Sequence, residues 1–286
     1  MPSSADTEAE SALDDHEGLD ALDDRQGLDA LDDREGRDAE RTTRQQKDNL
    51  CGPFHAARIL RDAGVRQWES EPLDQDLVAV RAGTTLPRHE DEPPVPPGAD
   101  SWRDYRHQLG SSSPASSGTS AGSLAEAIEA LSGGRLVCVP LSGTWSGETV
   151  QRLVQDGRRA GARLVANLRT GRLWGSRPPV ELLLARLEGR DLADPPPADW
   201  DVGHFVELVQ LVQGSGGALV VVRDSYPNLG WAGHHLQPPE ALAAALMRGD
   251  GRRGGVLAVV PASDAATVRA LARELGLEIE LWNNRR

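Results

Sequence analysis

The stretch QQKDNLCGPFHAARIL, residues 45 to 60, places a cysteine at the junction between a polar loop and a helix. Gly52 and Pro53 follow the cysteine, and a proline in the first turn of a helix is tolerated because that N–H has no helical partner. Apolar residues then recur at helical spacing, which predicts a helix of about three turns that ends at Gly64. A thiol at this position lies at the positive end of the helix dipole, which lowers its pKa. Cys51 is therefore a candidate nucleophile.

The composition is that of an ordinary globular chain, with 38% hydrophobic and 26% charged residues among 286. The net charge is -13, but residues 1–40 carry 15 acidic and 3 basic side chains, which leaves the remainder at -1. A nearly neutral remainder argues against nucleic acid as a partner. The chain has no basic and apolar leader and no apolar segment long enough to span a membrane, so we expect a cytoplasmic protein without a membrane partner. Two cysteines, Cys51 and Cys138, do not form a disulfide framework.

Residues 12–38 repeat with a period of nine, as ALDDHEGLD, ALDDRQGLD and ALDDREGRD. The leucines are too few to bury a face and a glycine interrupts each repeat, so the composition favours disorder. A calcium-binding nonapeptide roll needs a glycine pair in each repeat, which is absent. A short motif for a protein partner is the remaining alternative.

The middle and end of the chain contain clear helix and strand patterns. We expect helices over residues 123–134 (capped by Ser123, with Glu126 completing a capping box), 146–161 (capped by Ser146), 239–250 and 263–275, the last also capped. We expect strands over residues 135–141, 204–212, 218–226 and 255–261, with a further strand and turn after residue 161. The glycine-rich sequence GSGG predicts an antiparallel hairpin between residues 204–212 and 218–226.

The order of these elements, helices before most of the strands, predicts an α+β fold. The acidic repeat of residues 1–40 forms a tail, residues 43–262 form the main domain, and residues 263–286 add a C-terminal helix and a short tail. Within the main domain, residues 70–122 are a proline- and serine-rich insert. Inside this insert, SWRDYRHQLG (residues 101–110) has aromatic residues at helical spacing and predicts a short helix.

A cysteine nucleophile needs a base, and the base needs an acceptor that fixes its imidazole. His204 begins a predicted strand, and Asp224 lies near the end of the strand across the hairpin, so the two side chains are expected to lie close together. His16 lies in the repeat and His89 in a charged loop. His55, four residues after Cys51, is interpreted as a helix surface residue, although its spacing also permits contact with the thiol.

Other interpretations of these residues stay open. A histidine at a strand start is often structural, and Asp224 can cap a turn with its own side chain. His234 and His235 are possible metal ligands together with Asp224, but neighbours on an extended segment point to opposite faces, so we expect neither a metal nor another cofactor. The tryptophans Trp145, Trp174, Trp200 and Trp231 are candidates for either groove walls or core positions.

The chain resembles papain-like cysteine peptidases, and within them the bacterial domains that remove double-glycine leader peptides. The resemblance lies in Gln45, in CGP running into a helix, in GHFVEL and in VVVRDSYPN, with 153 positions between Cys51 and His204. It implies a papain-like fold, in which a helical part carrying the nucleophile packs on an antiparallel sheet carrying histidine and aspartate. The sequence departs from the family pattern after Asp224, where two residues precede the expected proline.

The resemblance also implies roles for four residues. Cys51 would be the nucleophile, His204 the base, Asp224 its orienting partner, and the Gln45 side chain a donor to the oxyanion, with Gln46 as the alternative. The expected activity is hydrolysis of a peptide or amide substrate through a thioester on Cys51. An acyltransferase on the same fold and a peptide-binding module without catalysis are the alternatives.

Overall fold

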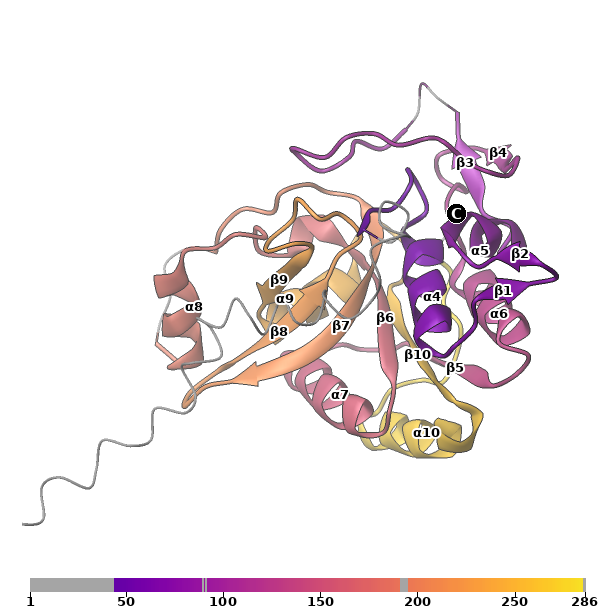
Figure 1. Ribbon diagram of the computed structural model, residues 1–286. Helices are drawn as coiled ribbons and strands as arrows, with labels where there is room; N and C mark the ends of the chain where they lie inside the picture. Colours follow the sequence, from indigo (N-terminus) through magenta and orange to yellow (C-terminus); the bar gives the residue numbers. More distant parts are fainter. Residues whose placement is uncertain (1–43, 89, 91, 191–194, 285–286) are drawn as a thin grey trace, which may run out of the picture. The chain divides into compact units, whose positions relative to one another are not determined.

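The computed structural model describes residues 44–88, 90, 92–190 and 195–284 (Figure 1). The acidic repeat, His16 and His89 lie outside the described residues. Helix α4 (Cys51–Asp62) is the helix predicted from residues 45–60. Ala63 follows it and Gly64 then takes a positive φ of 81°, a conformation that glycine adopts without strain. Cys51 is thus the first residue of a three-turn helix.

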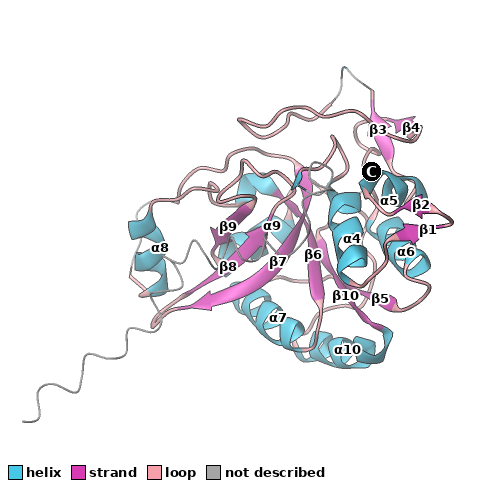
Figure 2. Cartoon of the chain, viewed as in Figure 1, coloured by secondary structure: helices cyan, strands magenta, loops and turns pink. Residues whose placement is uncertain are grey.

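A six-stranded sheet forms the centre of the described part of the chain (Figure 2). Every neighbouring pair in it is antiparallel. The strands are β5 (Leu136–Leu141), β10 (Gly255–Pro261), β6 (Arg163–Arg169), β7 (Gly203–Gln213), β8 (Ala218–Arg223) and β9 (His234–Gln237), in that spatial order. The proline of β5, Pro140, is tolerated because β5 is an edge strand. Together with the flanking helices, this antiparallel sheet confirms the α+β class.

The β7–β8 hairpin is paired as the sequence predicts. Gln213 lies opposite Ala218, and the pairing continues to Glu207 opposite Arg223 with one irregularity on the way. Gly217 permits a close approach to the end of helix α8 (Val180–Leu187), because an added Cβ would lie 2.0 Å from the carbonyl oxygen of Arg186. The start of β7 and the end of β8 therefore meet at one end of the sheet.

Helices cover both faces of the sheet. One face is packed by α7 (Gly147–Arg159), α9 (Pro239–Met247) and α10 (Ala265–Glu274), which share a buried apolar cluster with β5, β6, β7, β8 and β10. On the other face, α4 packs with α5 (Gln75–Arg81) and α6 (Ala121–Leu131) over side chains that include Phe205 and Val259. Helix α4, which begins at Cys51, thus lies directly on the strand that carries His204.

An ionic cluster around the buried Glu207 carboxylate links α4 to the sheet. Arg163, at the start of β6, binds the Glu207 carboxylate of β7 through Nε at 2.5 Å and the Asp62 carboxylate of α4 through Nη1 at 2.5 Å. Arg223 adds a second contact to Glu207 at 3.4 Å. Glu207 is buried, so its charge needs these partners. The cluster fixes the far end of α4 against β6 and β7.

Two local predictions were wrong. Residues 101–110 contain no helix, because Asp48 binds this segment in an extended form. The Asp48 carboxylate accepts the Trp102 N–H at 3.1 Å, and the Asp48 N–H donates to the Trp102 carbonyl at 2.9 Å. The cap of helix α6 lies three residues earlier than predicted, since Ser120 and not Ser123 caps the helix and accepts the Ser123 N–H. By contrast, Ser146 caps α7 as predicted.

The insert also contains regular structure that its composition did not indicate. Helix α5 is capped by Asp74, and Leu77 and Val78 of this helix join the cluster beneath α4. Short strand pairs flank it: β1 (Gln67–Trp68) with β2 (Glu71–Pro72), and β3 (Thr85–Pro87) with β4 (Gly110–Ser112). At the other end, the predicted helix α10 forms without a side-chain cap, after the short 3-10 turn η4 (Ala262–Asp264). A second such turn, η3 (Thr170–Arg172), follows β6.

Candidate active site

Cys51 lies where α4 meets β7. Asn49 takes a positive φ of 65° and turns the chain into the helix, and asparagine tolerates that conformation. Gly52 allows the helix to approach the sheet, because a Cβ at this position would lie 3.3 Å from the Phe205 ring. The Cys51 thiol is half-buried and not in a disulfide. The local sequence therefore places the sulfur beside the beginning of β7.

His204 and Asp224 form a buried pair at the end of the β7–β8 hairpin. His204 Nε2 lies 3.1 Å from Asp224 Oδ1, and both residues are buried. The proximity predicted from the hairpin is thus confirmed. Because Nε2 faces the carboxylate, Nδ1 is the ring nitrogen left for the Cys51 sulfur, whose pKa the neighbouring imidazole lowers.

The Asp224 carboxylate is held by its own turn. Oδ1 also accepts the Tyr226 N–H at 3.1 Å, while the Asp224 N–H donates to the carbonyl of Gly233 at 2.7 Å. The two residues between Asp224 and the proline of the turn, Ser225 and Tyr226, are buried. The turn that departs from the papain-like pattern thus supplies an anchor for the aspartate.

The three side chains change one another's pKa values. Burial raises the pKa of the Cys51 thiol, but the His204 charge, its hydrogen bond and the N–H groups of Phe205 and Gly52 outweigh burial, so the pKa lies below its ordinary value. Burial lowers the pKa of His204, yet the charges of Asp224 and Cys51 raise it to about 10. Burial also opposes ionisation of Asp224, but His204 holds the pKa of that carboxyl well below its usual range. This arrangement can present a thiolate and an imidazolium together near neutral pH.

Aromatic side chains pack around the imidazole. The ring of Trp200 meets that of His204 edge to face at 5.1 Å between centroids, and Tyr226 stacks on His204 at 6.1 Å. Trp200 also contacts Tyr226 at 5.5 Å. Of the four candidate tryptophans, Trp145 is buried, Trp231 is exposed, and Trp200 is the one that contacts His204. These rings restrict the access of water to the His204–Asp224 pair.

The structure separates the two candidate glutamines. Gln45 is directed away from the buried pair and donates from Nε2 to the Asp100 carbonyl at 2.9 Å. Gln46 is buried; its Oε1 accepts the Ser225 hydroxyl at 2.6 Å and its Nε2 donates to the Tyr226 hydroxyl at 3.0 Å. Ser225 in turn lies 3.4 Å from His204 Nε2. The alternative residue, Gln46, is therefore the glutamine that joins the Cys51–His204–Asp224 group.

The prediction that His55 lies on the helix surface was wrong. The residue is fully buried, and neither ring nitrogen has a hydrogen-bond partner among the described residues. Burial lowers its pKa to about 3, although the Glu207 and Asp224 charges oppose this. The sequence pattern misassigned His55 because α4 is buried on more than one side, between the sheet and the helices α5 and α6.

His234 and His235 contact different groups, as expected for neighbours on a strand. His234 Nε2 accepts a hydrogen bond from Arg223 Nε at 2.9 Å, whereas His235 Nε2 lies 3.8 Å from Asp224 Oδ2. Within the described ranges, no group of three or more His, Cys, Asp and Glu side chains is arranged to hold a metal ion.

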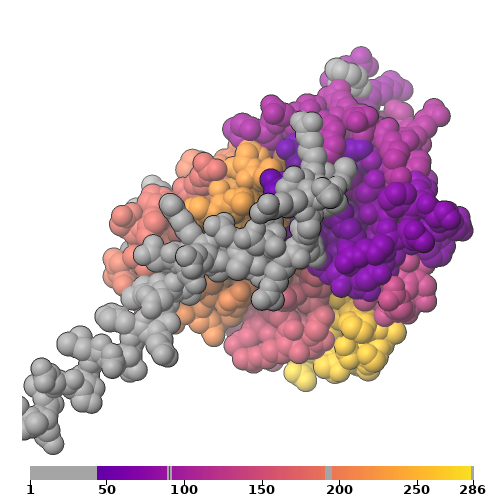
Figure 3. Space-filling model, in the orientation of Figure 1, coloured from indigo at the N-terminus to yellow at the C-terminus, as the bar shows by residue number. Residues whose placement is uncertain are grey.

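A segment of the insert, residues 97–105, which we call the strap, lies beside the site. Gln45 and Asp48 bind it on one side, and Asn228 donates to the Pro97 carbonyl at 2.7 Å on the other. In the space-filling view, the purple surface of the insert adjoins the orange surface of the turn after β8 (Figure 3). The strap therefore bridges the segment before Cys51 and the turn after Asp224.

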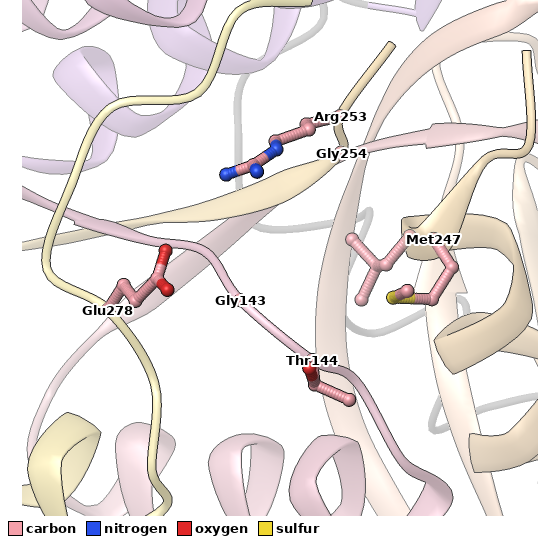
Figure 4. Close-up of a pocket in the computed structure, with 7 residues that line it drawn as sticks. Gly143, Thr144, Met247, Arg253, Gly254 and Glu278 are labelled. Carbon is pink, nitrogen blue, oxygen red and sulfur yellow. The ribbon is translucent and has the colours of Figure 1, made fainter. Parts of the chain in front are cut away.

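A separate cavity of about 240 Å³ is lined by residues at the ends of β5 and α9 and by the C-terminal tail (Figure 4). Its charged residues are Arg253 and Glu278, and Met247 forms an apolar wall. None of the three side chains of the Cys–His–Asp group lines it.

The fold and the site thus define an α+β protein with a buried histidine–aspartate pair next to a thiol at a helix start. The chain belongs to a family of unknown function, DUF6885, which matches residues 35–283. No curated protein and no solved structure matched the chain. Among the described residues, no helix has the length and apolar character needed to cross a membrane.

Proposed function

We propose that the protein is a cysteine peptidase or amidase that hydrolyses a peptide or amide bond through a thioester on Cys51. The observation that carries this proposal is the buried His204–Asp224 pair, 3.1 Å apart, beside a thiol whose pKa the His204 charge lowers. A structural histidine has no need of a reactive sulfur as its second partner. The nucleophile helix packed on an antiparallel sheet is also the arrangement expected of a papain-like fold.

In this mechanism, the Cys51 thiolate attacks the carbonyl carbon of the substrate. The C–N bond breaks, and the amine leaves with the proton of the His204 imidazolium. His204, now neutral, removes a proton from water, which attacks the thioester carbonyl. The acid leaves, and the thiolate–imidazolium pair is restored. Asp224 keeps its negative charge throughout and fixes the orientation of the imidazole.

The oxyanion of each tetrahedral intermediate requires donors. The N–H of Cys51 belongs to the first turn of α4, where backbone donors have no helical partner. The amide of Gln46 carries two N–H groups, one of which donates to Tyr226, so the second is the proposed side-chain donor. We assign this role to Gln46, since Gln45 binds the strap.

The test is hydrolysis of a peptide library by the wild-type chain, with Cys51→Ala and His204→Ala as inactive variants. Cys138→Ala is the matched control, because Cys138 is buried and its pKa is raised by burial and by the Glu129 charge. We expect new amino termini only with the wild type and Cys138→Ala. Added amines would appear in the product if the thioester is resolved by acyl transfer. Absence of both hydrolysis and transfer across the library, with Cys51 alkylated by iodoacetamide only near the free-thiol pKa of about 8.5, would refute the proposal.

Two free thiols fit the reducing cytoplasm as the compartment of this activity. The proposed partner is the peptide or amide substrate itself.

A further inference from the structure

The Asp224 carboxylate has a second histidine neighbour. His235, in β9, places Nε2 at 3.8 Å from Asp224 Oδ2, on the opposite oxygen from the one that binds His204. Both side chains are almost wholly buried, at 3% and 1% exposure. A buried carboxylate is costly unless both oxygens face donors, so the state of this second imidazole matters for Asp224.

The orientation of the Gln237 amide is fixed by backbone groups. Its Oε1 accepts the Trp174 N–H at 2.8 Å, and its Nε2 donates to the Trp174 carbonyl at 2.9 Å. Only one assignment of oxygen and nitrogen satisfies this pair of bonds, because a backbone N–H donates and a carbonyl accepts. Gln237 is fully buried, so the backbone of Trp174 sets the direction of its amide.

The second N–H of Gln237 then sets the tautomer of His235. Gln237 Nε2 lies 3.0 Å from His235 Nδ1, so Nδ1 must accept. A neutral imidazole that accepts at Nδ1 carries its proton on Nε2, the nitrogen that faces Asp224. The hydrogen bonds that link Trp174, Gln237 and His235 thus place the Nε2–H of His235 toward the Asp224 carboxylate.

We propose that His235, oriented by Gln237, is a positioning residue that keeps Asp224 ionised and aligned for His204. The inference rests on the proposed function, since it assigns the role of His235 in activating Cys51. Asp224 Oδ1 is already shared by His204 and the Tyr226 N–H. Without His235, Oδ2 would lose its facing N–H, and the carboxylate would share the proton of His204 instead of stabilising the imidazolium.

The chain supplies its own control in the adjacent residue. His234 accepts from Arg223 and is not directed at Asp224. Its replacement by glutamine keeps an acceptor for Arg223 and leaves the Asp224 surroundings unchanged. His235→Gln is the conservative variant, because an amide N–H can occupy the position of Nε2, whereas His235→Leu removes the donor at similar volume.

The experiment measures the iodoacetamide alkylation rate of Cys51 against pH by mass spectrometry, with melting curves for every variant. We expect the midpoint to rise by about one pH unit in His235→Leu, which makes alkylation about tenfold slower at pH values well below both midpoints. The midpoint should stay at the wild-type value in His235→Gln and His234→Gln. An unchanged midpoint in folded His235→Leu overturns the proposal, as does a His235→Gln midpoint that shifts equally.

If His235→Leu does not melt cooperatively, the alkylation midpoint of Gln237→Met tests the proposal instead. This variant removes the amide that fixes the tautomer, and it must shift the midpoint in the same direction; no shift overturns the proposal. A wild-type midpoint near the free-thiol value of about 8.5 is a different result, because it would refute the proposed function itself.

Discussion

Substitution of Glu207 by glutamine tests the ionic cluster that fixes α4 on the sheet. Burial opposes ionisation of this carboxyl, but Arg163 and Arg223 lower its pKa from 4.5 to about 2. A difference of about 2.5 pKa units corresponds to about 3 kcal/mol of folding free energy at pH 7. A loss of folding free energy of this size is typical when one partner of a buried ion pair is removed. We therefore expect Glu207→Gln to reduce the free energy of unfolding by about 3 kcal/mol at pH 7.

The contribution of Glu207 to the free energy of unfolding should fall as the pH is lowered. A carboxyl whose folded pKa is depressed contributes stability that is complete above its unfolded pKa, 4.5 here, and is lost as pH falls towards about 2. At pH 3, about 1.4 kcal/mol of the contribution should remain. Urea unfolding of wild type and Glu207→Gln at pH 7 and pH 3 measures both values. The difference between the two proteins should therefore shrink by about 2 kcal/mol on acidification.

The matched control is Glu240→Gln. Glu240 forms a surface pair with Arg186 at 2.6 Å and is 63% exposed, so solvent screening limits its contribution to less than about 1 kcal/mol. A Glu207→Gln penalty that is as small as that of Glu240→Gln, or that is equal at both pH values, would refute the reasoning.

Four further predictions follow from other parts of the structure. His55→Leu removes two buried nitrogen atoms that have no hydrogen-bond partner among the described residues, and it should raise the free energy of unfolding at pH 7 by about 1 kcal/mol; a lower urea midpoint would contradict this. Asp224→Asn keeps an acceptor but removes the charge that raises the pKa of His204, so alkylation of Cys51 at pH 6 should slow at least tenfold; an unchanged rate would contradict the role of that charge. Asp48→Ala removes the acceptor that binds Trp102, and limited proteolysis should then cut within residues 97–105 of the folded protein; resistance equal to that of wild type would show that other contacts suffice. Deletion of residues 1–40 should leave the melting temperature unchanged, because the repeat has too few leucines for a core; a large fall would assign it to the folded domain.

The parts of the fold that the sequence predicted are those in which local chemistry and tertiary packing agree. Two segments rich in β-branched residues and joined by a glycine-rich turn strongly favour an antiparallel hairpin. The hairpin and the proximity of His204 to Asp224 were therefore predictable. The helix at Cys51 was predictable because its turn residues, apolar spacing and terminating glycine all indicate the same element.

The parts that were missed depend on contacts between distant residues. Residues 101–110 have helical spacing, yet Asp48, more than fifty positions earlier, binds their backbone in an extended form. The choice between Gln45 and Gln46 is made by Ser225 and the strap, which lie far away in the chain. A period-based pattern contains no information on such pairings; it grouped His234 and His235 with Asp224 only as possible metal ligands and did not predict which of them faces the carboxylate.

The sequence separations within the site have a consequence for folding. His204 and Asp224 belong to one hairpin, whereas Cys51 must close a loop of 153 positions to reach them. Hairpins form in microseconds, and contacts of long sequence separation form later. A newly made chain therefore holds an ordinary thiol, and the sulfur acquires its low pKa only when α4 docks on β7. Pulsed alkylation during refolding would follow that docking directly. Activation of the proposed nucleophile is therefore expected to be a late step of folding.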